Sequence, residues 1–309
     1  MTAGRACQVC IRECPPGQSF CGRRDGTGRL VVRNRICALA VDSLFDKPIR
    51  NFAGDARILS LGSWGCNFRC RGCQNHRLSW TTSGEGLESI EMDPEAVVGL
   101  ALERGCAGVA ATFNEPAVLI EDVEDLAAAA RRAGLFSVFV TNSTLTIPSV
   151  RRIAPWLDAV AADIKSLEDD FYDRYCGAGG IEHPAEKVLA CIKAFRQAGC
   201  HVEVRTNVVP GGNDRESDLR GIARWINENL GAETPWHITR FFPAHELAHV
   251  SPTPARTLRE ARRTGLAEGL KHVYAYPSKS CDCAGEAAMI GLGVPEARTA
   301  ASTCKCCGH

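Results

Sequence analysis

The sequence predicts an α/β protein whose core is a partial (β/α)6 barrel of the TIM type, with cysteine-rich extensions at both ends. From about residue 55 onward, short β-rich runs alternate with longer helical runs, and this alternation repeats about six times. Repeated strand–helix–strand units form a parallel sheet with helices outside it, and six units fall short of a closed eight-stranded barrel. Cysteines gather near both ends of the chain. We therefore expect a cysteine-rich extension over residues 1–50, the barrel over 51–277 and a cysteine-rich tail over 278–309.

The expected strands are short apolar runs, and the expected helices between them have recognisable ends. In chain order the strands cover Ala56–Leu61, Gly108–Thr112, Leu135–Val140, Ala159–Ile164, His201–Val209, Trp236–Phe242 and His272–Tyr276. Asp93 and Pro94 are typical of a helix start, and Gly105 can end that helix. The further helices cover an alanine-rich stretch closed by Gly134 and residues 148–154, 185–198, 214–230 and 254–270.

Composition and charge exclude several classes of function. Among the 309 residues, 36 are basic and 36 acidic, so no overall field attracts nucleic acid or an anionic membrane. No apolar run reaches the ~18–20 residues that a membrane-spanning helix needs. The N-terminal residues lack the apolar centre of a secretory signal. We therefore expect a cytoplasmic protein that binds neither nucleic acid nor membrane.

The chain has 17 cysteines, an odd number, and most of them are clustered, which a disulfide framework would not require. Cytoplasmic thiols stay reduced, so ligation of a metal or cluster explains them better. One group has a spacing suited to a four-thiolate iron–sulfur cluster or a zinc site, and it consists of Cys7, Cys10, Cys14 and Cys21. A second group could hold another cluster or zinc, with a redox-active tail as the alternative: Cys281, Cys283, Cys304, Cys306 and Cys307.

The segment Gly62–Asn75 directly follows the first expected barrel strand and contains Cys66, Cys70 and Cys73. Three thiolates can ligate three irons of a cubane cluster and leave the fourth iron open to an outside molecule. The same spacing would place the thiols on one face of a helix, but each glycine in the segment costs a helix roughly 1 kcal/mol. A zinc knuckle is the other alternative, although zinc prefers a fourth protein ligand nearby. The pattern favours a cluster that takes part in chemistry.

Polar residues follow the expected strands at their carboxyl ends. In barrels of this kind, the loops after the strands form the active face. Each polar residue alone could be a cap or a turn residue, but a shared location makes a common site the better interpretation. The residues are Asn114 and Glu115, Thr141 and Asn142, Asp163 and Lys165, Arg205 and Asn207, and His237.

The three-cysteine loop after the first barrel strand resembles the radical S-adenosylmethionine (SAM) superfamily. Other motifs are similar to the pyruvate formate-lyase activating enzyme branch: Cys73-Gln74-Asn75, Asn114-Glu115-Pro116, Thr141-Asn142, Asp163-Ile164-Lys165, Tyr175-Cys176-Gly177 and Pro235-Trp236-His237. The N-terminal cysteine spacing and the run 37–42 are most similar to radical SAM enzymes of the AmmeMemoRadiSam system. The resemblance implies a 4Fe-4S cluster on Cys66, Cys70 and Cys73, and S-adenosyl-L-methionine as a cofactor that is cleaved to a 5′-deoxyadenosyl radical.

The resemblance also implies contacts with SAM. Asn114 and Glu115 match the motif that meets the methionyl amine, Lys165 and Arg205 match cations for its carboxylate, and His237 matches the residue at the ribose. Asn142 is a weaker candidate contact, and Asp163 is expected to brace its strand end.

Three departures limit the resemblance. Gly72 stands where an aromatic residue commonly packs near adenine, so Phe68 or Trp64 would have to replace it. Val140 stands where the formate-lyase activators carry an aspartate, and their N-terminal Asp-Gly-Pro-Gly segment is absent here. The last two differences weaken a direct transfer of glycyl-radical activation.

We therefore expect a radical SAM enzyme that abstracts hydrogen from a protein or peptide substrate, with a flavodoxin- or ferredoxin-type electron donor. One alternative is a radical SAM enzyme that acts on a small molecule. Another, from a different class, is a non-catalytic iron–sulfur or zinc protein of electron transfer.

Overall fold

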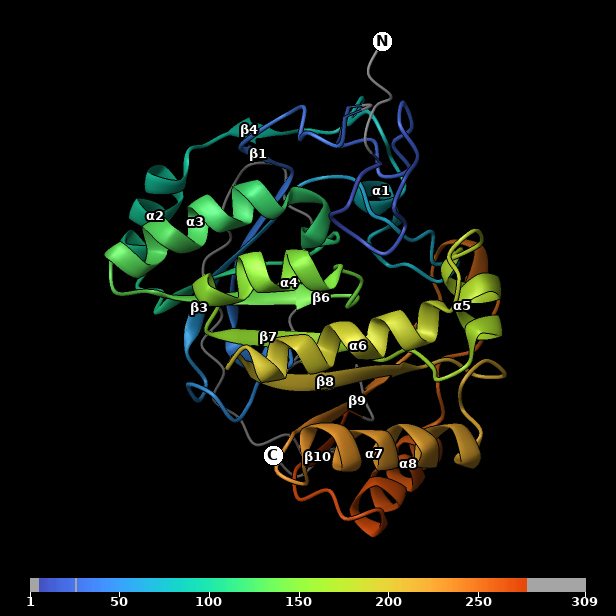
Figure 1. Ribbon diagram of the computed structural model, residues 1–309. Coiled ribbons are helices and arrows are strands. Elements are labelled where there is room, and N and C mark those ends of the chain that lie inside the picture. Colours follow the sequence, from blue (N-terminus) through green and yellow to red (C-terminus); the bar gives the residue numbers. More distant parts are fainter. Residues whose placement is uncertain (1–5, 26, 277–309) are drawn as a thin grey trace.

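The computed structural model describes residues 6–25 and 27–276, and its centre is one eight-stranded, mostly parallel sheet (Figure 1). The strand order is β10-β9-β8-β7-β6-β5-β3-β2, and only β2 runs antiparallel to its neighbour. The strands are β2 (Ala38–Ser43), β3 (Arg57–Gly62), β5 (Gly108–Ala111), β6 (Phe136–Thr141), β7 (Ala159–Asp163), β8 (His201–Val208), β9 (Trp236–Arg240) and β10 (Val273–Tyr276). The predicted α/β class and partial barrel are confirmed.

Helices cover the outer face of this sheet (Figure 1). The crossover helices are α2 (Pro94–Glu103), α3 (Ile120–Arg132), α4 (Ile147–Ile153), α6 (Pro184–Gln197), α7 (Glu216–Leu230) and α8 (Ala255–Ala267). Shorter elements are α1 (His76–Ser79), α5 (Asp169–Cys176), the 3-10 turns Leu44–Asp46, Pro116–Leu119, Ala154–Trp156 and His245–Leu247, and the two-stranded ribbon β1 (Arg35–Ile36) with β4 (Ile90–Glu91). The expected start of α2 is confirmed, because the Asp93 carboxylate accepts the Ala96 N–H.

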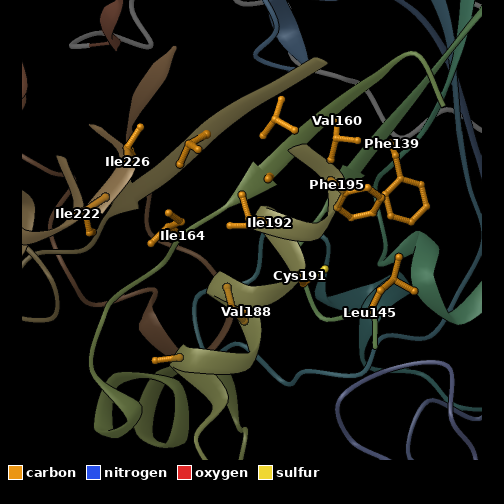
Figure 2. Packing of buried hydrophobic residues seen from close by; sticks show 14 of the residues in the cluster. Phe139, Leu145, Val160, Ile164, Val188, Cys191, Ile192, Phe195, Ile222 and Ile226 are labelled. Atoms are coloured by element: carbon orange, nitrogen blue, oxygen red, sulfur yellow. The ribbon is translucent and has the colours of Figure 1, made fainter. Parts of the chain in front are cut away.

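The largest hydrophobic core lies between the strands and the outer helices. Figure 2 shows Val188, Ile192 and Phe195 of α6 directed toward the sheet, where Phe195 meets Phe139 with a ring-centroid distance of 6.0 Å. Such burial of large side chains stabilises the sheet by roughly 1.5–3 kcal/mol for each side chain. The strands therefore form a rigid support for the loops at their carboxyl ends.

A second core fills the inner face of the barrel at the amino ends of the strands. Leu44 and Ile49, from the segment after β2, pack there against Ile58, Ala110 and Ala161. These strand residues alternate with neighbours that face the helices, so they point to the inside. The alanines leave room for the incoming side chains. Residues 44–52 thus form a plug that closes the amino end of the barrel.

The sheet ends at β2 and β10, which are not paired with each other. The plug, which follows β2, also contacts the strands on the other side of this gap. The backbone N–H groups of Arg50 and Asn51 donate to the Glu203 carboxylate of β8, and the Tyr274 hydroxyl of β10 donates to Asn51 Oδ1. β2 and residues 44–50 of the plug lie within the predicted extension 1–50, yet β2 belongs to the sheet and the plug packs against it.

Residues 6–25 and 27–34, before β1, form an irregular segment against the carboxyl side of the barrel (Figure 1). Cys10 forms an isolated β-bridge with Leu145, in the loop after β6. Arg12 donates to the carbonyls of Asn67 (2.9 Å) and Gly177 (2.8 Å). The segment therefore contacts the three-cysteine loop directly. Over the described part of the chain, every helix is too short or too polar to cross a lipid bilayer.

Candidate functional site

The three-cysteine loop follows β3 without forming a helix. At Gly62, a Cβ atom would lie 2.4 Å from the Thr112 carbonyl oxygen, so only glycine lets β3 and the β5 end approach this closely. Residues 63–75 are irregular, and α1 begins at His76. The helical alternative for Cys66, Cys70 and Cys73 is therefore wrong, and the loop carries the thiols on backbone that turns around them.

Of the three cysteines of this loop, Cys66 is buried, and Cys70 and Cys73 are partly exposed. The Cys66 sulfur accepts the Phe68 N–H at 3.4 Å and the Asn142 side-chain amide at 3.8 Å. Burial raises the pKa of Cys66 far above its ordinary value. Burial is also the main cause that raises the pKa of Cys73 to about 11, and the charge of the neighbouring Cys70 adds to it. The free thiols therefore stay protonated, and iron must displace their protons when it binds.

The loop offers three free cysteines as a donor set. Soft thiolate ligands suit iron–sulfur chemistry, and three of them leave one iron of a cubane without a protein ligand. Cys66, Cys70 and Cys73 would hold such a cluster.

Asn114 holds the cysteine loop in place. Its Oδ1 accepts the Ser63 N–H at 2.9 Å, and its Nδ2 donates to the carbonyls of Trp64 and Gly65 at 3.1 and 2.9 Å. Sequence reasoning placed this residue at the SAM amine. The structure brings it to the site, but with its amide engaged by the loop backbone.

Glu115 and Asn142 lie together beside Cys66. The buried Glu115 carboxylate accepts the Ala117 N–H (2.9 Å), the Thr141 hydroxyl (2.8 Å) and the Asn142 N–H (2.7 Å). Burial raises the pKa of Glu115 to about 7, against the lowering effect of these donors. The Asn142 side chain donates to Asn67 Oδ1 at 2.9 Å as well as to the Cys66 sulfur. These residues therefore form one polar network behind the first thiol.

The predicted cations converge on Asp163 at the next strand ends. Arg205 donates to both carboxylate oxygens of Asp163 at 2.6 Å, and the Lys165 ammonium donates to one of them at 2.6 Å. Burial would raise the pKa of Asp163, but Arg205 and Lys165 outweigh it and hold this pKa below its ordinary value. Burial likewise opposes the charge on Lys165, and Asp163 outweighs it and raises the pKa of Lys165. Both cations are thus fixed and charged.

His237 lies in the same row of the sheet as Arg205 but has other partners. The β8–β9 ladder pairs Arg205 with His237. One ring nitrogen of His237 is 2.6 Å from the Glu203 carboxylate and the other is 2.8 Å from the Tyr276 hydroxyl. The structure therefore joins His237 to Glu203 and Tyr276 rather than to Asp163 and its cations.

Three residues outside the predicted set of SAM contacts lie near the loop: Tyr175, Cys176 and Phe241. A Cβ at Gly72 would lie 2.8 Å from Phe241 and 2.8 Å from the Tyr175 hydroxyl, so these two rings occupy the space beside the glycine. Phe68 and Trp64, the expected substitutes, are buried against Tyr172 and under Arg23. A hydrogen bond to Cys176 is the main cause that raises the pKa of Cys70. Tyr175 and Cys176 belong to a motif noted in the sequence, but no local signal places them or Phe241 beside the loop.

The N-terminal thiols Cys7, Cys10, Cys14 and Cys21 line one hollow next to Asn67. The C-terminal group Cys281, Cys283, Cys304, Cys306 and Cys307 lies outside the described residues. Its predicted cluster or zinc therefore stays a prediction.

Comparison with known proteins fits this geometry. Residues 63–226 match the Radical SAM superfamily. A protein of Methanocaldococcus jannaschii described as uncharacterized is 36% identical over 277 residues, which cover 87% of this chain and 80% of that protein. The isethionate sulfite-lyase activating enzyme of Nitratidesulfovibrio vulgaris is 28% identical, and the match covers 62% of each chain. The pyruvate formate-lyase-activating enzyme of Streptococcus mutans is 22% identical over 69% of this chain and 83% of that enzyme.

Among solved structures, a radical SAM methyltransferase from Sphaerobacter thermophilus shares the fold with a TM-score of 0.57 and 14% identity, over 74% of this chain and 68% of that one. The family match spans more than half of the sequence, so the chain belongs to the radical SAM superfamily. It is an enzyme of the class that cleaves SAM at a 4Fe-4S cluster. Its relatives include activating enzymes, which confirms the predicted likeness to that branch. The narrower likeness to AmmeMemoRadiSam enzymes stays a prediction.

Proposed function

We propose that this radical SAM enzyme abstracts hydrogen from a protein or peptide substrate. The observation that carries the proposal is the shape of the barrel. Its amino end is closed by the plug of residues 44–52, while β2 and β10 leave the sheet open on one side. A segment of another chain can therefore approach the polar strand ends only from the carboxyl side and the open edge. The names of the two related activating enzymes support a macromolecular substrate.

The residues of the site would have different roles. Cys66, Cys70 and Cys73 would hold the cluster, which when bound supplies the electron that cleaves SAM to a 5′-deoxyadenosyl radical. Glu115 would face the methionyl amine of SAM, and Lys165 and Arg205 would face its carboxylate. Asp163 keeps the guanidinium of Arg205 in a fixed orientation through its two 2.6 Å bonds.

Other residues prepare the site before SAM binds. Asn114 sets the path of the cysteine loop by its three bonds to residues 63–65. Phe241 and Tyr175 lie beside Gly72 and the plug packs against the inner face, and these groups would limit the access of water to bound SAM. Electrons would come from a flavodoxin- or ferredoxin-type protein, and Asn142 and His237 would complete the surroundings of SAM.

Deuterium transfer tests this proposal. Anaerobically reduced enzyme should form 5′-deoxyadenosine from SAM, and a deuterated protein or peptide substrate should transfer deuterium into that product. Cys70→Ala should abolish the product, because the cluster loses a ligand, whereas Cys106→Ala, in the core behind α2, should retain it. Transfer from a small metabolite but from no protein fraction would refute the substrate class. Absence of 5′-deoxyadenosine from the reduced, iron-loaded wild type would refute the chemistry as well.

A further inference from the structure

The irregular segment at the N-terminus brings four thiols to one place. Cys7, Cys10, Cys14 and Cys21 all line a single hollow, whose wall also includes Phe20 and Asn67. All four are free cysteines. Residues 6–25 contain isolated β-bridges but no helix or longer strand, and the Cys7 N–H donates to the Cys14 carbonyl at 2.9 Å. Such a segment has little core of its own, so a ligand held by its thiols would fix its conformation.

Two arginines lie near the thiols of this hollow and also near those of the three-cysteine loop. Arg12 lies near Cys10 and Cys14 on one side and Cys66 on the other. Arg69 lies near Cys21 and also near Cys66 and Cys70, and its guanidinium donates to the Phe20 carbonyl at 2.9 Å. Both guanidinium groups lie over the Phe20 ring, at 3.5 and 4.5 Å from its centroid. These two cations would offset negative charge on the thiolates of both groups.

Asn67 joins the two groups of thiols directly. Its side chain hydrogen-bonds the Cys10 thiol and also contacts the Cys66 sulfur at 3.9 Å. The same side chain donates to the Thr144 hydroxyl at 2.6 Å and accepts from Asn142 at 2.9 Å. The N-terminal hollow is therefore one residue away from the first ligand of the loop, and this contact is fixed by buried hydrogen bonds.

We propose that Cys7, Cys10, Cys14 and Cys21 hold a second iron–sulfur cluster, ligated by four thiolates and adjacent to the one on Cys66, Cys70 and Cys73. Thiolates select soft metal centres, and all four cysteines line one hollow. Residues 63–226, which match the Radical SAM superfamily, contain the three cysteines of the loop and none of these four. A cluster with four protein ligands has no open iron, so it would not bind SAM. The proposal goes beyond SAM cleavage and the substrate class.

Metal analysis of matched variants tests the second cluster. Cys7→Ala/Cys14→Ala removes the two partly exposed thiols of the group, so the rest of the fold should be little disturbed. This variant should lose about four iron and about four sulfide ions per chain relative to wild type. The control Cys106→Ala/Cys200→Ala, at buried positions before β5 and β8, should lose none. All C-terminal cysteines are kept in every variant, so their contribution cancels.

Electron paramagnetic resonance (EPR) distinguishes the two clusters. In reduced Cys7→Ala/Cys14→Ala, the remaining signal should still shift when SAM is added. In Cys66→Ala/Cys70→Ala/Cys73→Ala, a signal should persist that SAM leaves unchanged. Cys14→Ser, which has an oxygen in place of the sulfur, should alter only the EPR signal that does not respond to SAM. This single variant replaces Cys7→Ala/Cys14→Ala in the experiment if the double variant fails to fold.

Two results would overturn the proposal. Iron content equal to wild type in Cys7→Ala/Cys14→Ala would show that these thiols hold no cluster, and loss of one zinc with unchanged iron would assign the hollow to zinc. If wild type and Cys7→Ala/Cys14→Ala had the expected iron contents but wild type failed to cleave SAM, the proposed function would be contradicted. The proposal of a second cluster would still hold.

Discussion

At the scale of single residues, Glu115 makes stability depend on pH. Burial raises the pKa of Glu115 to about 7 in the folded chain, above the ordinary value of 4.5. A carboxyl with a raised folded pKa favours the folded state while it is protonated, and this contribution is lost as pH rises from about 4.5 through about 7. Protonation thus compensates for the cost of burying the charge.

We expect Glu115→Gln to remove this dependence, because glutamine does not titrate. The difference in free energy of unfolding between wild type and Glu115→Gln should change by on the order of 2 kcal/mol between pH 5 and pH 8, to the disadvantage of wild type at the higher pH. Urea unfolding of the metal-free proteins measures it. A difference that is constant over this range would show that Glu115 titrates normally.

Residue types were easier to predict than their partners. Glu115, Lys165 and Arg205 follow strands, and parallel strands bring their carboxyl ends together, so the sequence was enough to place them at one site. Other contacts join residues about 35 to 50 positions apart in the chain. Asn114 binds the cysteine loop in this way, and so do both ring nitrogens of His237 with their partners. Local sequence patterns do not predict such long-range contacts.

At the scale of elements, the junction of β3 with the cysteine loop depends on Gly62. A Cβ there would lie 2.4 Å from the Thr112 carbonyl oxygen, which belongs to the backbone and cannot move aside cheaply. Gly62→Ala should therefore displace the start of the loop, with a cost of about 1–3 kcal/mol in stability and a large loss of cluster iron. Gly99→Ala in α2 is the matched control, because nothing lies within 4 Å of its added Cβ.

Thermal unfolding and iron content measure this prediction. Gly99→Ala should bind iron as wild type does and gain up to about 1 kcal/mol, since alanine favours a helix. If Gly62→Ala retained wild-type iron content and stability, the close approach of β3 to Thr112 would not govern the loop.

Elements with strong local signals were the predictable part of the fold. Strands β3 and β5–β10 and the capped or glycine-terminated helices follow from apolar runs and their end residues. β1 and β4 have two residues each and carry no periodicity, and α5 is a short helix with acidic and aromatic residues interleaved. Such elements form because the rest of the chain supplies their contacts, so sequence patterns alone do not reveal them.

At the scale of the whole molecule, the plug and the N-terminal segment divide the barrel into two ends. Residues 44–52 fill the amino end with apolar side chains, and residues 6–25 lie against the cysteine loop at the other end. The chain thus closes one end and adds thiols and arginines to the end where chemistry takes place. This arrangement makes the plug a structural element whose loss should affect the barrel before it affects the cysteine loop.

Glu203 anchors the plug, and its substitution tests whether the plug and the cysteine loop unfold independently. Its buried carboxylate accepts the N–H groups of Arg50 (3.0 Å) and Asn51 (2.7 Å). Burial would raise the pKa of Glu203, but the bonds with His201 and His237 outweigh it and lower this pKa to about 2. A carboxyl with a lowered folded pKa stabilises the fold above about pH 4.5, and the contribution is lost as pH falls toward 2.

We expect Glu203→Gln to destabilise the protein at pH 7 by about 2–3 kcal/mol, because charge-assisted bonds to two backbone N–H groups and two histidines are weakened. The deficit relative to wild type should shrink as pH falls from about 4.5 to 2, where wild type loses the same charge. Hydrogen exchange should accelerate in residues 44–52 and leave residues 63–75 protected, since Asn114 and Arg69 hold the loop independently. Equal acceleration in both segments would mean that the two ends of the barrel unfold as one unit.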